Sequence, residues 1–346
     1  DRQLVSPDQI SLLIVDEAHR TIGDYAYSGI AERFRNTNVR IIGMTATLPS
    51  EKDKATEILQ TLRISSIAQR TEDSPDVKPY VQQTETQWIT VDLPPEMKEI
   101  QSCLIVSLDS RYQDLKRMGL NLSDNKSLSQ LLRVREFVIR QNRRAAKPLF
   151  TAIRITHALN VFESHGVTSF LRFCERTQEK KGVGIKDLFE NDLNFAKAIR
   201  LAKVAQAKGM EHPKIVKLEE ILESISGKAL VFTSYRDSVE IIHQKLIEMG
   251  IAAGFLIGKA GETGLKQKKQ IETVQKFRDG EYKVLIATRV GEEGLDISEV
   301  NLVVFFDNVP SSIRYIQRKG RTGRKSLGRL VVLIAKDTMD ETYYWI

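Results

Sequence analysis

Hydrophobic positions change their spacing twice along the chain, and these changes divide it into three segments. In residues 1–92, continuous apolar runs alternate with amphipathic stretches. Runs of this kind are typical of parallel strands that are buried on both faces. We predict strands at 11–15, 40–44 and 88–91 and a helix at 51–62. The first segment is therefore expected to be α/β, and Leu93, Pro94 and Pro95 mark its end.

The middle segment, residues 93–212, has helical periodicity and no strand pattern. Pro148 separates two of its helices, because proline cannot continue the hydrogen bonding of a helix. We predict long amphipathic helices at 96–118, 128–147, 150–178 and 185–208. This segment is expected to be an all-α module inserted between two α/β segments.

The third segment, residues 213–346, returns to alternating strands and helices. We predict strands at 228–232, 252–256, 284–287, 302–306 and 329–334, and helices at 238–249, 265–279 and 312–319. This order predicts a nearly complete doubly wound domain with a parallel sheet.

Composition and charge point to a polyanionic partner. No apolar run approaches the roughly 20 residues of a membrane span, so we expect no membrane association and a cytosolic protein. Cys103 and Cys174 are then expected to be buried, reduced side chains. The net charge is +7, and residues 93–212 hold 21 Lys and Arg against 13 Asp and Glu. The basic excess therefore belongs to the middle segment.

One predicted helix of that segment is rich in basic residues. At helical spacing, Arg140, Arg143, Arg144 and Lys147 would share one face and suit the phosphates of a nucleic acid. The alternative is a solvated charged face, which is usual for a run of charges. The concentration of net charge in this segment favours nucleic-acid binding.

Two adjacent carboxylates, Asp16 and Glu17, directly follow the first predicted strand, and His19 comes two residues later. The carboxyl ends of parallel strands are where open α/β sheets bind ligands. Nucleotide hydrolysis needs one carboxylate to hold Mg²⁺, largely through water, and a second to orient the attacking water. Asp16 fits the first role and Glu17 the second. An ordinary helix start with acidic residues is the alternative.

Small hydroxyl residues end the second predicted strand, at Thr45 and Thr47. They could bond the carboxylates or His19 and report nucleotide state to a nucleic-acid site. The alternative is a simple helix cap.

The most specific string lies near the C-terminus, at 317–324, and reads Q-R-K-G-R-T-G-R. Guanidinium groups neutralise the charge on a transferred phosphoryl group. Arg321 and Arg324 fit that role better than a solvated basic helix end, and Gln317 stands four residues before the first of them.

Polar and glycine-rich strings follow two further predicted strands. Gly291 and Gly294 permit close approach of the backbone to a ligand, and Asp296 is placed to bond a ribose hydroxyl. A glycine-rich turn with a helix cap is the alternative. Thr288, Thr233 and Ser234 stand at strand ends where they could contact a phosphate backbone.

The order of these strings resembles motifs II to VI of superfamily-two helicases. The strings are D-E-A-H, T-A-T, F-T-S-Y-R, T-R-V-G-E-E-G-L-D and Q-R-K-G-R-T-G-R. The strings at 24–27, 74–77, 290–294 and 343–345 resemble those of archaeal Hef, which belongs with vertebrate FANCM and more distantly with RIG-I-like and Dicer helicases. The resemblance implies two RecA-like parallel-sheet domains of P-loop NTPase type, the first incomplete, with an all-α thumb-like insertion between them.

The resemblance also implies cofactors and residue roles. ATP and Mg²⁺ are the expected cofactors, with Asp16 and Glu17 at the metal and His19 coupled to Thr45 and Thr47. Gln317 would sense the γ-phosphate, Arg321 and Arg324 would act as arginine fingers, and Gly294 and Asp296 would contact the nucleotide.

The same resemblance implies partners and a cellular role. Forked or branched duplex DNA is the expected substrate, in repair and replication-fork restart in the archaeal cytosol or nucleoid. A downstream nuclease domain and a sliding-clamp-type partner are implied outside this chain. The alternatives are a double-stranded RNA-activated ATPase of RIG-I or Dicer type and a non-catalytic nucleic-acid-binding fragment.

One expected motif is missing. The family needs G-x-x-x-x-G-K-[ST] before D-E-A-H, so that backbone amides wrap the β- and γ-phosphates, and the sequence contains no such stretch. We expect that the first half-domain is missing from this chain and that the chain alone does not turn over ATP.

Overall fold

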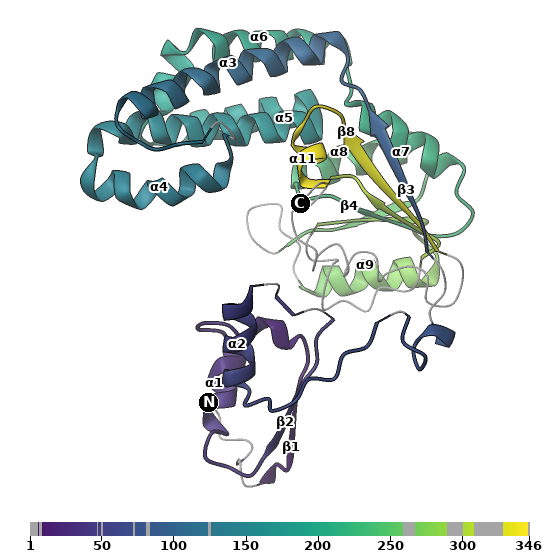
Figure 1. The fold of residues 1–346 in the computed structure, drawn as a ribbon. Helices are drawn as coiled ribbons and strands as arrows, with labels where there is room; N and C mark the ends of the chain where they lie inside the picture. The colour runs from purple at the N-terminus through teal and green to yellow at the C-terminus, as the bar shows by residue number, and fades with distance from the viewer. Residues whose placement is uncertain are drawn as a thin grey trace. The chain divides into compact units, whose positions relative to one another are not determined.

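The computed structural model describes residues 6, 9–46, 48–49, 51–71, 73–80, 84–123, 126–258, 267–288, 300–307 and 328–344. The described residues up to 80 form one compact unit, and those from 84 onwards form a second (Figure 1). No helix in this part of the chain is long and apolar enough to span a bilayer.

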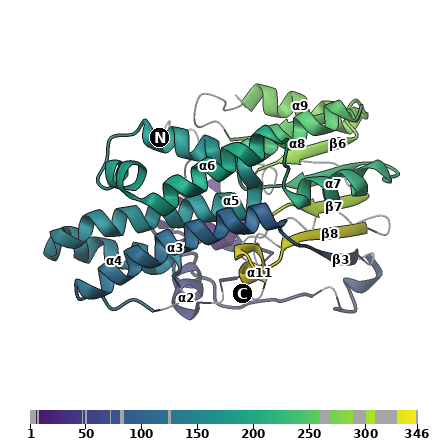
Figure 2. The ribbon, with the colours of Figure 1, turned by 90° about the horizontal axis from the view of Figure 1, so that it is seen from above.

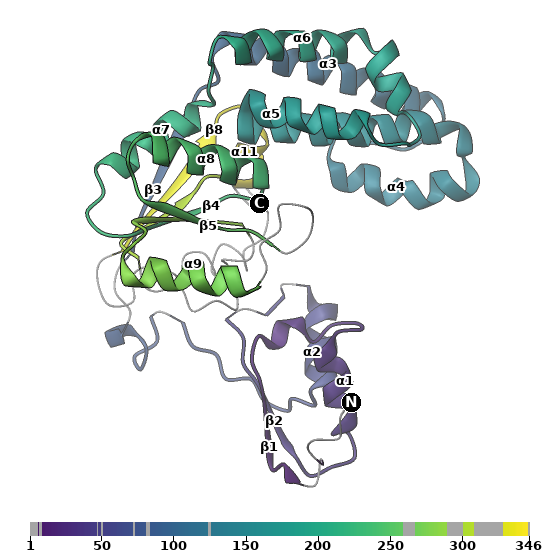
Figure 3. The ribbon, with the colours of Figure 1, turned by 180° about the vertical axis from the view of Figure 1, so that it is seen from behind.

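The first unit contains a two-stranded parallel sheet of β1 (Leu12–Val15) and β2 (Arg40–Gly43). Helices α1 (Ala26–Arg33) and α2 (Lys52–Thr61) lie on one side of this sheet (Figures 1 and 3). The core of the unit consists of Val15, Ala18, Ala31, Ile58 and Leu62.

Only one face of this sheet is buried among the described residues, so the predicted burial on both faces is wrong there. Side chains alternate between the faces of a strand. Val15 therefore joins the core, and Leu13 and Ile41 pack against it. Leu12, Ile14 and Ile42 point the other way and are 45%, 53% and 41% exposed. The apolar runs predicted the strands correctly but not how many layers cover them.

The second unit is built on a six-stranded parallel sheet in the order β3-β8-β7-β4-β6-β5. Five of its strands match the predicted ones to within about a residue. They are β4 (Ala229–Phe232), β5 (Ala253–Leu256), β6 (Val284–Ala287), β7 (Leu302–Phe305) and β8 (Gly328–Ala335). Every residue of β4, β6 and β7 is buried, as their continuous apolar sequences predict.

Helices cover both faces of this sheet. Figure 3 shows α7 (Pro213–Glu223) and α8 (Arg236–Glu248) on one face and α9 (Gln267–Asp279) on the other. Leu218 of α7 and Ile242 of α8 pack on Val231 and Val304 in one core cluster. The last helix, α11 (Met339–Tyr344), follows β8, and we did not predict α1, α7 or α11.

The remaining strand, β3 (Thr84–Val91), corrects the predicted organisation of the chain. We expected a strand at 88–91 to close the first segment, but β3 pairs with β8 along its whole length, from Thr84 opposite Gly328 to Val91 opposite Ala335 (Figure 2). The amide of Lys336 extends the ladder to Val91 O at 3.0 Å. The chain therefore enters the second sheet before it forms the helical module and returns to that sheet afterwards.

Four long helices form the predicted all-α module between β3 and α7. They are α3 (Pro95–Arg117), α4 (Leu128–Gln141), α5 (Ala146–Gln178) and α6 (Leu193–Ala207). Figures 1 and 3 show α3 and α6 running along α5, with α4 at the N-terminal end of α5, away from the sheet. Leu104, Phe162, Phe170 and Phe195 are completely buried between them.

The predicted single helix at 128–147 is wrong, because the chain breaks at Asn142 (φ −133°, ψ 62°). A short 3₁₀ turn, Arg143–Ala145, follows, and α5 begins at Ala146. A helix running through Pro148 would clash with the carbonyl group of Arg144, whereas proline is tolerated in a first turn. Pro148 therefore sets the start of α5 rather than a gap between two helices.

Helix α5 is itself kinked at Gly166, whose backbone has φ 80° and ψ −168°. Only glycine adopts this conformation readily. A Cβ atom there would also lie 3.0 Å from His212 Cβ. Residues on both sides of the kink, including Phe162 and Phe170, belong to the core of the helical module.

Candidate nucleotide and nucleic-acid sites

The turn after β1 presents the predicted pair of carboxylates. Asp16 is exposed, and its Oδ1 accepts a hydrogen bond from the Glu17 amide at 2.9 Å. Glu17 has a left-handed backbone (φ 51°, ψ 46°), which is uncommon for a residue other than glycine and tends to persist at functional sites. The Ala18 amide donates to Met44 O at 2.8 Å and so fixes the turn against the end of β2.

His19 joins the ends of the two strands. Its Nδ1 lies 3.0 Å from Thr45 Oγ1 and 3.2 Å from Glu17 Oε2. Burial lowers the pKa of His19 below its ordinary value, while the negative charge of Glu17 opposes the shift. A neutral imidazole can either donate to or accept from a hydroxyl group. Thr47, the other residue predicted to couple to His19, lies outside the described residues.

The donor set of this turn fits a magnesium ion. Glu17 Oε2 is buried, and the polar atom beside it is His19 Nδ1 at 3.2 Å. Mg²⁺ prefers oxygen ligands and usually takes one or two carboxylates together with substrate phosphates and water. The described residues contain no cluster of three or more His, Cys, Asp or Glu side chains that could hold a metal.

At the carboxyl end of β4 in the second sheet, one buried carboxylate organises the polar strand end. Asp307, which follows β7, accepts from Thr233 Oγ1 at 2.8 Å and from the Ser234 amide and hydroxyl at 2.6 and 2.8 Å. We did not predict a role for Asp307. It could have been found, because it follows an apolar strand just as Asp16 does.

The three residues predicted to contact phosphates here differ in how exposed their side chains are. Thr233 and Thr288 are 0% and 6% exposed, and Ser234 is exposed. The Thr233 hydroxyl is directed at Asp307, and that of Thr288 lies 3.4 Å from Leu256 O. Of the three residues, Ser234 exposes its side chain in this structure, whereas the hydroxyl groups of Thr233 and Thr288 are directed into the protein.

His165, beside the kink of α5, connects the helical module to this strand end. Its Nδ1 lies 2.6 Å from Ser238 Oγ, and its Nε2 lies 3.6 Å from Asp307 Oδ2. Burial lowers the pKa of His165 to about 4, although Asp307 opposes the shift, so the ring is neutral at physiological pH. The ring also packs against Tyr235, with centroids 4.4 Å apart. The sequence offered one indication of this site, because a glycine within a helical pattern, as at position 166, can mark a special backbone position.

Two arginines extend the same connection. Arg176 of α5 makes two hydrogen bonds to Asp237 of α8, at 2.8 and 2.5 Å. Arg172 donates to Glu240 at 3.1 Å. Planar two-point pairs of this kind fix geometry as well as charge. The helical module is therefore held against the sheet that carries Ser234.

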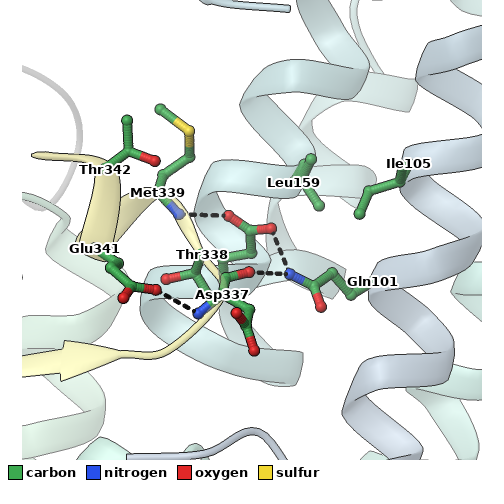
Figure 4. Close-up of a pocket in the computed structure, with 9 residues that line it drawn as sticks. Gln101, Ile105, Leu159, Asp337, Thr338, Met339, Glu341 and Thr342 are labelled. Carbon is green, nitrogen blue, oxygen red and sulfur yellow. Dashed lines mark hydrogen bonds between the residues drawn. The ribbon is translucent and has the colours of Figure 1, made fainter. Parts of the chain in front are cut away.

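A cavity of about 460 Å³ lies where α3, α5 and the start of α11 meet (Figure 4). Glu163 lies at its wall, with Oε1 accepting from Gln101 Nε2 at 2.7 Å and Oε2 accepting from the Met339 amide at 3.0 Å. Burial raises the pKa of Glu163 to about 7, against the effect of these hydrogen bonds. Both carboxylate oxygens accept hydrogen bonds from the protein itself. We therefore assign the cavity to the packing of α3 and α5 against α11 and not to ligand binding.

The predicted basic residues do not form one helical stripe. Arg140 ends α4, Arg143 and Arg144 lie in the 3₁₀ turn, and Lys147 is in the first turn of α5. All four are exposed. Within the described chain the three arginines pair with no carboxylate, whereas Lys147 pairs with Asp187 at 2.8 Å. These residues still form an exposed basic surface, now on three consecutive segments.

The remaining predicted site residues lie outside the described residues. They are Gly294, Asp296, Gln317, Arg321 and Arg324.

Comparisons with known proteins match both ends of the chain to helicase-type families. The model described as "Helicase conserved C-terminal domain" matches residues 213–326, and "Type III restriction enzyme, res subunit" matches residues 1–50. The solved helicase domain of Hef from Pyrococcus furiosus is 36% identical, with a TM-score of 0.73. That match covers 99% of this chain and 74% of the other.

Curated relatives are considerably longer than this chain. A Methanocaldococcus jannaschii protein named as an ATP-dependent RNA helicase is 36% identical over 98% of this chain and 44% of its own length. An ATP-dependent DNA helicase of Pyricularia oryzae is 33% identical over 97% of this chain and 34% of its own length. The chain thus spans less than half the length of these relatives.

Proposed function

The chain belongs to the Hef family of superfamily-two helicases, and from this membership we propose that it forms much of the motor of an ATP-dependent DNA helicase or translocase. The observation that carries the proposal is the arrangement after β1, where His19 contacts both Glu17 and Thr45. A hydrolytic carboxylate is there connected to the end of the neighbouring strand. Such a connection is what a motor needs to convert hydrolysis into movement.

Each carboxylate has a separate role in this proposal. Asp16, exposed at the strand end, holds Mg²⁺ largely through water, and Glu17 orients the attacking water. The metal supplies charge neutralisation at the β- and γ-phosphates when nucleotide is bound. His19 stays neutral and transmits the position of Glu17 to Thr45 through the Nδ1 contact. Thr47 is proposed to share this coupling.

The proposed roles on the other side of the nucleotide rest on the family pattern. Gln317 is the γ-phosphate sensor, Arg321 and Arg324 are arginine fingers, and Gly294 and Asp296 contact the nucleotide. Guanidinium groups are suited to the charge that develops on the transferred phosphoryl group.

Nucleic-acid binding is proposed at two places in the second unit. Ser234 contacts the phosphate backbone at the strand end, while Asp307 positions it by accepting from its amide and hydroxyl groups. Arg140, Arg143 and Arg144 bind phosphates on the helical module, with a smaller share from Lys147 because Asp187 already neutralises it. The proposed substrate is forked or branched duplex DNA, remodelled in repair and replication-fork restart.

Substitution of Arg140, Arg143 and Arg144 together by Glu tests this proposal. Affinity for forked DNA is expected to fall by at least tenfold at low salt, and the slope of log affinity against log salt should become shallower, because fewer counterions are released. Fluorescence anisotropy with a labelled fork measures both. Unchanged affinity and slope would contradict the proposal. Stimulation of ATP hydrolysis in the full-length protein by duplex RNA but not by the fork would replace DNA with RNA as the substrate.

A further inference from the structure

Helix α4 carries an exposed aromatic ring between two exposed arginines. Arg133, Phe137 and Arg140 follow one another at spacings of four and three residues, so they share one face of the helix. Phe137 is 48% exposed, although most large apolar side chains of the module are buried. In Figures 1 and 3, α4 lies at the end of the module farthest from the sheet of its unit.

This face is not needed for the packing of the helix. Leu131 and Val138 are completely buried on the opposite side, where α4 contacts the core of the module. Within the described residues, Arg133 and Arg140 have no carboxylate partner, and Phe137 has no aromatic neighbour. By contrast, Arg135 lies over the ring of Phe150 at 5.8 Å. The two arginines and the ring between them are therefore available to a ligand.

The chemistry of the face indicates which ligand it fits. Arginines bind phosphates, and an aromatic ring between them offers a surface on which a nucleobase can stack. A base exposes its π-face only when it is unpaired and unstacked, as in a single-stranded arm or at a branch point. Arg133 and Arg140 are separated along the axis by roughly 10 Å, enough to hold the backbone on either side of one stacked base.

We propose that Phe137 is a stacking platform for an unpaired nucleobase and makes the helical module prefer DNA with a single-stranded arm over a continuous duplex. The inference rests on the proposed DNA binding by this module. It adds a residue that distinguishes unpaired from paired DNA, a distinction that phosphate contacts alone do not provide.

The same helix offers a matched control. Ile139 is 44% exposed, close to the value for Phe137, but it lies two positions on and so about 200° around the helix axis. Ile139 shares its side of α4 with Leu132, which is 45% exposed. A protein partner that covered exposed apolar surface would use this side, whereas a stacked base would use only Phe137.

Binding of two labelled DNAs distinguishes these outcomes: a fork with unpaired arms and a fully paired duplex of the same length. We expect Phe137→Ala to weaken fork binding by about five- to 150-fold, the range for removing one aromatic stack, and to leave duplex binding unchanged. Phe137→Trp should restore fork binding, but Phe137→Leu, which is apolar without a π-face, should not. Ile139→Ala should bind both DNAs like the wild type.

A measurement without any substitution checks the same contact. The fluorescence of 2-aminopurine placed in the unpaired arm should fall when the unaltered protein binds, because stacking on an aromatic ring quenches it. Equal loss for fork and duplex with Phe137→Ala, full rescue by Phe137→Leu, or the same loss with Ile139→Ala would overturn the proposal. If the wild-type chain binds neither DNA, the proposed nucleic-acid function itself fails; if it binds both without preference, only Phe137's role fails.

Discussion

Lys214 Nζ lies 2.5 Å from Asp340 Oδ2, and both side chains are completely buried. The ammonium group also donates to Phe306 O at 2.8 Å. This ion pair joins the first turn of α7 to α11 and to the end of β7. Buried pairs contribute little net stability, but removal of one partner leaves an uncompensated charge in the interior. Lys214 and Asp340 should therefore be strongly coupled.

Lys214→Met is expected to lower the free energy of unfolding of the chain by about 3–5 kcal/mol, because Asp340 stays buried without its partner. The double variant Lys214→Met with Asp340→Leu should lose clearly less free energy of unfolding than Lys214→Met alone. Urea unfolding measures both. Lys217→Met, which breaks the exposed pair with Glu220, should cost less than about 1 kcal/mol. Equal losses in the single and double variants at the buried site would contradict the coupling.

Glu163→Gln should stabilise the chain at high pH. The pKa of Glu163 is raised to about 7 by burial, so the folded state binds the proton more tightly than the unfolded state. The contribution of the protonated Glu163 side chain to the free energy of unfolding is fully present below about pH 4.5, and it is lost as the pH rises to 7. The gain from the variant should reach on the order of 3 kcal/mol at pH 8 and vanish near pH 4.5.

Unfolding midpoints measured across that pH range test the expectation for Glu163. The same change at Glu136, which is exposed on α4, controls for the loss of one negative charge. A gain that is constant with pH would show that ionisation of the buried carboxylate is not the cause.

Local patterns predicted the parts of the fold that local physics determines. The runs at 229–232 and 284–287 contain only apolar residues because their strands are covered on both sides. The position of Asp16 was predicted correctly, because it directly follows an apolar strand, at the edge where parallel sheets bind ligands. Asp307 also directly follows an apolar strand. We did not predict a role for it, because it is not part of a longer recognisable motif.

The remaining features depend on contacts between residues that are distant in sequence, and the local sequence pattern does not predict such contacts. The pairing of β3 with β8 joins strands from opposite ends of the second unit, so neither sequence identifies the other. The break at Asn142 falls within residues that suit a helix, and it arises from the conflict between Pro148 and the helix upstream. His165 resembles any core histidine until the kink at Gly166 brings it to Ser238.

Asp307→Asn should weaken both the fold and DNA binding. Asn keeps one side-chain oxygen, so its amide nitrogen would face either the Ser234 hydroxyl or both the Thr233 hydroxyl and the Ser234 amide, which is expected to cost about 1–3 kcal/mol of stability. DNA affinity should fall because Ser234 is no longer held in place. Thermal unfolding and anisotropy measure the two effects separately.

Two alanine variants separate positioning from contact at the same strand end. Thr233→Ala should lower stability and leave DNA affinity nearly unchanged, since its hydroxyl is buried. Ser234→Ala should lower DNA affinity several-fold. The opposite pattern would assign the phosphate contact to Thr233.

The 346-residue chain is expected to show no meaningful ATP turnover, because its sequence has no G-x-x-x-x-G-K-[ST] stretch to wrap the phosphates. Phosphate release by the purified chain should equal that of its Glu17→Gln variant, which serves as the matched background. Turnover above that background would contradict the expectation and show that other residues can hold the nucleotide.

The pairing of β3 with β8 also has a consequence for biosynthesis. Among the strands that the structure describes, β3 lies at the edge of the sheet beside β8, and nearly the whole second unit lies between these two strands in sequence. At translation rates of about 5–20 residues per second, β3 leaves the ribosome on the order of tens of seconds before its neighbour. Contacts between such distant residues form slowly. Synthesis of β8, rather than the strength of any local contact, should therefore set the time at which this unit becomes resistant to proteases.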